Sequence, residues 1–277
     1  MLNQLPLEHG WFGWSMYFEN INKNVNIFTS QDSWTGERLD IVDSPLGKLN
    51  YYFDDAVRTD YQINSVFPPF VKVKREDRNN TYSGLDEFLE IIKGICNRPN
   101  NQFVYAYYPD PDATMHDYGV TSEMAKGVIE NISQKVQALA ESTKDTLFVI
   151  TADHGQVDVE GYVDLCADQK LMDMLKIYPY MEAKAVAFMV KDDMKAEFEK
   201  HFNQNYSEDF KLYTSKELID AGYFGDFGDK GYMLGDFIAI GTYTHKQALT
   251  TPDYPKFKGH HTSLTEEMLV PLIIINN

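Results

Sequence analysis

Short runs of apolar residues, separated by polar and turn-forming stretches, recur along most of the chain. Apolar runs of this length, bounded by Gly, Pro, Asn or Asp, predict β-strands. Because these runs are apolar at nearly every position, and not at alternate ones, they are typical of strands covered on both faces of a parallel sheet. The predicted strands span residues 103–108, 147–151, 185–190, 235–240 and 272–275.

Two longer segments repeat apolar residues with the spacing of an α-helix. Their apolar side chains would share one helix face and pack against the core. We expect one helix to begin after Ser83 and the other after Thr121 or Ser122, because these hydroxyls cap helix N-termini. The two apolar stripes are Leu85, Phe88, Leu89, Ile92 and Ile95, and Met124, Val128, Ile132, Val136 and Leu139.

The alternation of predicted strands and helices indicates an α/β fold with a mainly parallel sheet and helices on both of its faces. With 277 residues the chain is long enough for a substantial core, and we expect residues 1–277 to form a single domain. Residues 156–235 contain many polar and turn-forming residues. They are expected to form an irregular cap or insertion over the sheet.

Composition excludes several classes of protein. The chain carries 42 acidic and 25 basic residues, a net charge of -17, which argues against binding of a nucleic-acid polymer. A small phosphate ester remains compatible with this charge, because bound cations can reverse the local sign. No apolar stretch is long enough to span a membrane. The two cysteines lack CxxC spacing and no signal peptide is visible at the start, so a cytoplasmic protein is expected.

Candidate metal ligands begin with Asp112 and His116. Residues four apart are neighbours on one face of a helix, and a carboxylate with an imidazole suits zinc. Asp110 and Asp117 are nearby alternatives, so the choice of Asp112 depends on spacing. The structural alternative is that these aspartates form turns beside the prolines of this loop.

A second pair, Asp153 and His154, directly follows the predicted strand 147–151. Ligands in α/β sheets gather at the carboxyl ends of strands, where Asp112 is also expected to lie. The alternative is an aspartate that caps a turn and a histidine on the surface. Near the C-terminus, His260 and His261 offer two further imidazoles, of which one is expected to bind metal.

In this order, the candidate ligands resemble those of the alkaline phosphatase superfamily, and most closely its type I phosphodiesterase and nucleotide pyrophosphatase branch. Residues 6–10, Pro-Leu-Glu-His-Gly, resemble the Pro-x-x-His-Gly turn that follows the family's nucleophile. Residues 264–272 resemble the segment after its last metal histidine, and that register selects His261 over His260.

The resemblance implies an alkaline-phosphatase-like fold with two divalent metal ions, for which zinc is expected and manganese is the alternative. Asp112, His116 and His261 would hold one ion. Asp153 and His154 would bind the second, and that site would be incomplete, because a further ligand and the nucleophile would precede Met1. The resemblance therefore implies an N-terminally truncated domain in which no catalytic nucleophile is assigned.

The function implied by the resemblance is metal-dependent hydrolysis of phosphodiester or pyrophosphate bonds in small molecules such as nucleotides. This chain is expected to be inactive or impaired without the nucleophile. The alternatives are a phosphomonoesterase or phosphomutase on the same scaffold, and a non-catalytic remnant that binds metal. A sheet without its central strand would expose an edge and apolar surface, so a homodimer is also expected.

Overall fold

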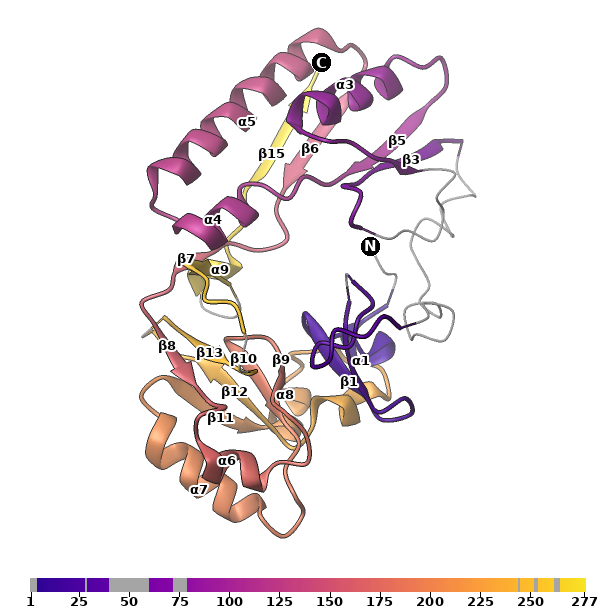
Figure 1. Cartoon of the computed structure of the whole chain (residues 1–277). Coiled ribbons are helices and arrows are strands. Elements are labelled where there is room, and N and C mark those ends of the chain that lie inside the picture. The colour runs from indigo at the N-terminus through magenta and orange to yellow at the C-terminus, as the bar shows by residue number, and fades with distance from the viewer. Residues whose placement is uncertain are drawn as a thin grey trace.

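The computed structural model of the protein describes residues 4–27, 29–39, 60–71, 79–243, 245–251, 254–261 and 265–277. Its elements form two groups, an upper lobe and a lower lobe, which meet near β7, β14 and α9 (Figure 1). The junction elements are β7 (Val157–Asp158), β14 (Gly259–His260) and α9 (Thr265–Met268). Part of the segment that supports the family resemblance, which begins at Leu264, lies outside the described residues.

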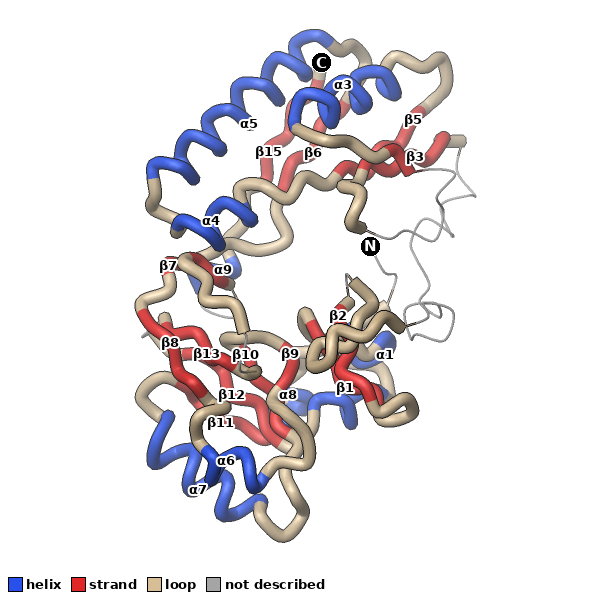
Figure 2. Tube along the Cα trace, viewed as in Figure 1, coloured by secondary structure: helices blue, strands red, loops and turns tan. Residues whose placement is uncertain are grey.

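The upper lobe contains helices that pack on one face of short strands (Figure 2). Its elements are α3 (Leu85–Cys96), α4 (Asp112–Tyr118), α5 (Glu123–Ser142), β3 (Gln62–Val66), β4 (Asn79–Asn80), β5 (Gln102–Ala106), β6 (Leu147–Thr151) and β15 (Leu272–Asn276). Strands β4, β3 and β5 pair in parallel, and β15 pairs antiparallel with β6. Phe88 and Ile95 of α3 share a core with Val104 of β5 and Phe148 of β6. Both sheets therefore pack under the same helices.

The lower lobe is built on a six-stranded antiparallel sheet in the order β11-β12-β10-β9-β1-β2. Phe198 and Phe202 of α7 pack on Phe188 of β10, and all three side chains are fully buried. Its helical elements are α1 (Pro6–His9), α6 (Gln169–Met174), α7 (Lys195–Tyr206), α8 (Ser215–Asp220) and the 3-10 helix η4 (Lys230–Leu234). Its strands are β1 (Ser15–Phe18), β2 (Lys23–Asn26), β8 (Gly161–Asp164), β9 (Tyr180–Met181), β10 (Ala185–Phe188), β11 (Phe210–Thr214), β12 (Phe237–Gly241) and β13 (Lys246–Leu249).

The predicted positions of strands and helices are largely confirmed. Each of the five predicted strands overlaps an observed one, and β6 has the predicted bounds. Ser122 caps α5, because its hydroxyl accepts a hydrogen bond of 3.1 Å from the Ala125 amide. The predicted cap of α3 is wrong: Gly84 is the N-cap residue, and the Ser83 hydroxyl instead donates to Glu87 at 2.6 Å.

The predicted mainly parallel sheet is wrong. The sheets are small and largely antiparallel, and parallel pairing is confined, in the described parts of the chain, to β3 with β4 and β5, and to β8 with β13. A continuous apolar run indicates a strand but carries no information on its direction. The prediction of helices on both faces also fails for the upper lobe, where α3 and α5 cover the same face (Figure 1).

The span 156–235, predicted as an irregular cap or insertion, contains α6, α7, α8 and five of the strands above. The assignment of residues 1–277 to one domain stays a prediction. In the described part of the chain, every helix is too short or too polar to cross a membrane.

The uncovered face of β6 and β15 is strongly apolar. Val149 and its cross-strand partner Ile274 are 57% and 61% exposed, and Leu147 and Leu272 are also exposed. Exposed apolar surface of this kind favours association between molecules. The expected homodimer stays a prediction that this face makes testable.

We expect the protein to self-associate through this face as its concentration rises. The double variant Val149→Lys/Ile274→Glu places opposite charges on directly paired positions, so it should lower the associated fraction and preserve the strand pairing. Sedimentation velocity at several concentrations measures the effect. A wild-type protein that stays monomeric throughout the range would contradict the expectation.

Candidate metal centre

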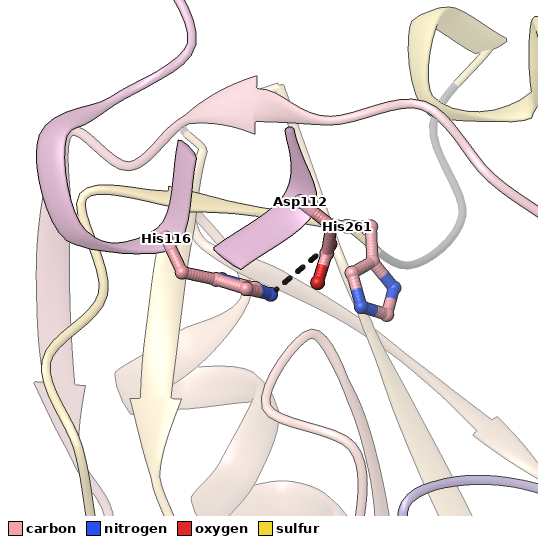
Figure 3. Close-up of side chains that lie close together, drawn as sticks. All are labelled: Asp112, His116 and His261. Atoms are coloured by element: carbon pink, nitrogen blue, oxygen red, sulfur yellow. Dashed lines mark ion pairs between the residues drawn. The ribbon is translucent and has the colours of Figure 1, made fainter. Parts of the chain in front are cut away.

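Three predicted ligands from distant parts of the chain converge at the junction of the two lobes. The ligand atoms of Asp112, His116 and His261 all lie within 4.8 Å of one another (Figure 3). Within the described residues, this is the group of three or more His, Cys, Asp or Glu side chains that has the spacing for a metal ion. All three side chains are partly buried, so solvent or a small ligand can reach them.

Helix α4 places the first two ligands on one face, as their spacing predicts. Asp112 is the first residue of this helix, and His116 follows one turn later. The distance between Asp112 Oδ1 and His116 Nε2 is 3.4 Å. Two ligands of a tetrahedral zinc ion with bonds of about 2.0–2.1 Å lie about 3.4 Å apart, so this pair already has the required separation.

A backbone carbonyl fixes the orientation of the His116 ring. His116 Nδ1 lies 2.7 Å from the Gly259 carbonyl oxygen, to which it donates in the tautomer that leaves Nε2 unprotonated. Nε2, on the other side of the ring, faces Asp112. A side chain at position 259 would not fit, because its Cβ would lie 2.7 Å from the Met115 carbonyl oxygen. Glycine at this position therefore permits the close approach of β14 to α4.

The protonation of the three groups follows from their contacts. Burial alone would raise the pKa of Asp112, but the hydrogen bond to His116 and the nearby imidazoles lower it overall. Burial opposes protonation of His116, yet Asp112 outweighs it and raises the His116 pKa. Burial, with the neighbouring His154, lowers the pKa of His261 to about 4. His261 is therefore neutral at physiological pH, as a metal ligand must be.

The second predicted pair, Asp153 and His154, lies beside this group. The loop after β6 brings His154 Nε2 to 3.9 Å from Asp112 Oδ1 and 3.8 Å from Asp153 Oδ1. The rings of His154 and His261 stack with centroids 3.6 Å apart. All five predicted ligands are therefore neighbours, although Asp153 is largely exposed.

Sequence reasoning missed Gln156, which contacts the same carboxylate. Its Nε2 donates to Asp112 Oδ1 and, at 3.3 Å, to the Asp112 carbonyl oxygen. Its Oε1 is buried and has no hydrogen-bond partner among the described residues. Its position directly after Asp153-His154-Gly155 is the one feature of the sequence that could have pointed to it. A glutamine there indicates no role until the fold places it against α4.

Replacing Gln156 with leucine should weaken metal binding by about tenfold, because residues that orient a ligand typically contribute 10- to 100-fold to metal affinity. Isothermal titration calorimetry with zinc measures the change. Gln137→Leu, which alters an exposed glutamine on α5, serves as the control. Equal zinc affinity in the two variants would contradict an orienting role for Gln156.

Three histidines outside the candidate group have structural contacts. His260 is buried with its pKa lowered to about 2, and its Nδ1 accepts from the His261 amide at 2.7 Å. His9 Nδ1 accepts from the Trp11 amide at 3.0 Å. His201 Nε2 lies 2.6 Å from Asp168 Oδ2, which joins α7 to the start of α6. His9 and His201 are therefore occupied by other contacts, whereas His260 packs against the rings of His116 and His261 without joining the ligand group.

Aromatic side chains at the end of β5 also lie near the centre. Burial, followed by the charges of Asp153 and Asp112, raises the pKa of Tyr107 to about 12. Burial and Asp153 also raise the pKa of Tyr105. Phe67 contacts both tyrosine rings, with centroids 5.6 and 6.5 Å away. Two tyrosine side chains, with Phe67 packed against them, therefore interact with the charges of the candidate ligands.

A further carboxyl group, Glu182, lies in the turn between β9 and β10. Burial raises its pKa to about 7, although its carboxylate accepts a hydrogen bond from the Trp14 amide. Because the folded-state pKa is raised, the folded protein holds this proton more tightly than the unfolded chain does. The associated stability is present below about pH 4.5 and is lost as the pH rises through about 7.

The variant Glu182→Gln should therefore be more stable than the wild type at pH 8, by on the order of 2 kcal/mol, and nearly equal to it at pH 4. The neutral amide imitates the protonated acid and still accepts from Trp14. Urea unfolding of both proteins at the two pH values measures the difference. A stability difference that does not change with pH would show that the Glu182 carboxyl is not the titrating group.

Comparison with known proteins gives one family and several similar folds. The model of a family described as type I phosphodiesterase/nucleotide pyrophosphatase matches residues 4–263. None of the curated protein sequences matches the chain.

The similar structures include murine ectonucleotide pyrophosphatase/phosphodiesterase 5, with a TM-score of 0.74 and 16% identity over 100% of this chain and 74% of that one. An inactive form of the murine protein, in complex with AMP, has a TM-score of 0.72 and 16% identity over 99% and 74% of the two chains. The human protein has a TM-score of 0.68 and 15% identity over 98% and 72%. At these identities the likeness concerns the fold.

Proposed function

Because the chain belongs to the type I phosphodiesterase/nucleotide pyrophosphatase family, we propose that it serves metal-dependent hydrolysis of phosphodiester or pyrophosphate bonds in small molecules. The observation that carries this proposal is the convergence of Asp112, His116 and His261 within metal-binding distance. One carboxylate and two imidazoles form a ligand set that suits zinc, and manganese is the alternative.

In this proposal the three residues hold one divalent ion and leave a coordination position open. Such an ion supplies Lewis-acid stabilisation of phosphoryl oxygens. The roles of the chain's own groups follow from their contacts. Gln156 and the Gly259 carbonyl keep Asp112 and His116 in place, and the buried surroundings of His261 keep its imidazole unprotonated.

Asp153 and His154 are proposed as ligands of a second ion. Their ligand atoms lie 3.8 Å apart, and His154 Nε2 lies 3.9 Å from Asp112 Oδ1, so this pair lies directly beside the three-residue group. Two protein ligands are fewer than the three that catalytic zinc sites normally have. The second site therefore needs at least one further donor. We assign no nucleophile within the chain.

A nucleotide is the proposed substrate class. One similar structure holds AMP. In this chain, Tyr105 and Tyr107 lie close enough to Asp153 to interact with its charge, and Phe67 packs against both rings. The three residues offer aromatic surface of the kind that stacks on a base. The net charge of -17 would disfavour a phosphate ester elsewhere on the surface, so the bound cations would determine where such a substrate binds.

The experiment compares the hydrolysis of bis-p-nitrophenyl phosphate and p-nitrophenyl phosphate with zinc or manganese present. It uses the chain and, where the gene continues upstream, the extended protein. Preference for the diester supports the proposal. Preference for the monoester would favour a phosphomonoesterase or phosphomutase on the same scaffold. Zinc binding without cleavage of either substrate by the extended protein would favour a non-catalytic metal-binding protein.

A further inference from the structure

A buried ion pair joins the lower lobe to the segments that carry the candidate ligands. The Lys184 ammonium contacts the Glu267 carboxylate, and the two side chains are 0% and 1% exposed. Lys184 lies in the turn between β9 and β10, and Glu267 lies on α9 at the junction. Neither group can reach a substrate, so a role in the reaction would have to act through other residues.

The turn that carries Lys184 is fixed to three neighbouring segments. The Lys184 carbonyl accepts from the Gly241 amide at 2.7 Å, and the Ala183 carbonyl accepts from the Ala248 amide at 2.8 Å. These bonds attach the turn to β12 and β13. On its other side, the Glu182 carboxylate holds the Trp14 amide. The ammonium group therefore projects from a well-anchored part of the lower lobe.

The opposite end of the ion pair is hydrogen-bonded to a loop that carries candidate ligands. The Glu267 carbonyl accepts a hydrogen bond of 2.7 Å from the amide of Gly155. Gly155 directly follows Asp153 and His154, and Glu267 is six residues after His261. A displacement of Glu267 would therefore pass to the loop after β6, whose His154 ring stacks on the ring of His261.

We propose that Lys184 is a positioning residue: through Glu267 it holds the loop of Asp153 and His154 in place, with the His154 ring stacked on His261. The role in metal binding rests on the proposed function. An unpaired charge in this buried place would be strongly unfavourable, so the two groups must stay in contact. The need to keep this contact restricts how α9 can sit against the turn.

The test uses the double variant Lys184→Met/Glu267→Met. Removal of one partner alone would leave a buried charge and could unfold the protein, but replacement of both by apolar residues of similar size is usually tolerated. The first readout is hydrogen exchange of the Gly155 amide in the metal-free protein. The second is zinc affinity by calorimetry. We expect faster exchange at Gly155 and a zinc dissociation constant raised by about tenfold.

Phe198→Leu is the matched control. It alters a fully buried side chain of α7, far from the junction in the fold, and lowers general stability without changing the ion pair. This variant should keep the wild-type exchange at Gly155 and the wild-type zinc affinity, measured well below its unfolding temperature.

If the Gly155 amide exchanges as slowly in the double variant as in the wild type, the proposal is overturned. It would also be overturned if the wild type binds zinc and the double variant binds it equally well. If the wild-type protein binds no zinc, that result would contradict the proposed function instead. In that case faster exchange at Gly155 would still support the positioning of the loop by Lys184.

Discussion

Replacing His261 with alanine is expected to reduce the zinc affinity of the protein by more than about 100-fold. Loss of a direct ligand should exceed the 10- to 100-fold loss typical of residues that only orient ligands. His261 is also the ligand that comes from the C-terminal part of the sequence, so its removal leaves Asp112 and His116 on α4 as a two-ligand site. Isothermal titration calorimetry with zinc, below the unfolding temperature of each variant, measures the effect.

The variant His201→Ala is the control for this loss. His201 is also a partly buried histidine beside an aspartate, but its contact with Asp168 joins α6 to α7 in the lower lobe. It should change stability and leave zinc affinity unaltered. If the His261 variant and the wild type bind zinc with equal affinity, His261 is not a zinc ligand.

Replacing Asp153 with alanine in a protein that hydrolyses phosphodiesters should lower kcat/KM by about 1000-fold. A bound metal ion contributes several kcal/mol of transition-state stabilisation, and each 1.36 kcal/mol corresponds to tenfold in rate. Because the Asp153 side chain is 71% exposed, its removal should leave the folding stability nearly unchanged. Initial rates with bis-p-nitrophenyl phosphate and thermal unfolding of the same samples measure the two quantities.

Asp117→Ala provides a control on a nearby element. Asp117 is an exposed carboxylate on α4, next to His116 in the sequence, and it is outside the group of candidate ligands. Its loss should change kcat/KM little. A similar loss of activity in both variants would indicate that general negative charge, and not a specific ligand at position 153, matters for the reaction.

The sequence predicted local features of the fold and of the site well. The strand at residues 147–151 and the helical spacing of Asp112 and His116 are local patterns, and both are observed. The proximity of His261 to them did not follow from spacing, since it lies 145 residues after His116; only the family resemblance implied it. The structure brings His261, and not His260, into the group.

Contacts between residues far apart in the chain could not be predicted from the sequence. The contact of Gln156 with Asp112 spans 44 residues, and that of Lys184 with Glu267 spans 83. Neither pair has a local pattern. The direction of the strands was also mispredicted, because the apolar run of β15 resembles a buried parallel strand although it is largely exposed and antiparallel to β6.

Anomalous diffraction at the zinc absorption edge, from crystals of the protein grown with zinc, is the most direct test of the proposed metal site. If the three residues share one ion, the peak will lie about 2.0–2.2 Å from ligand atoms of Asp112, His116 and His261 together. A crystal with zinc bound elsewhere, and with these three side chains free of metal, would contradict it.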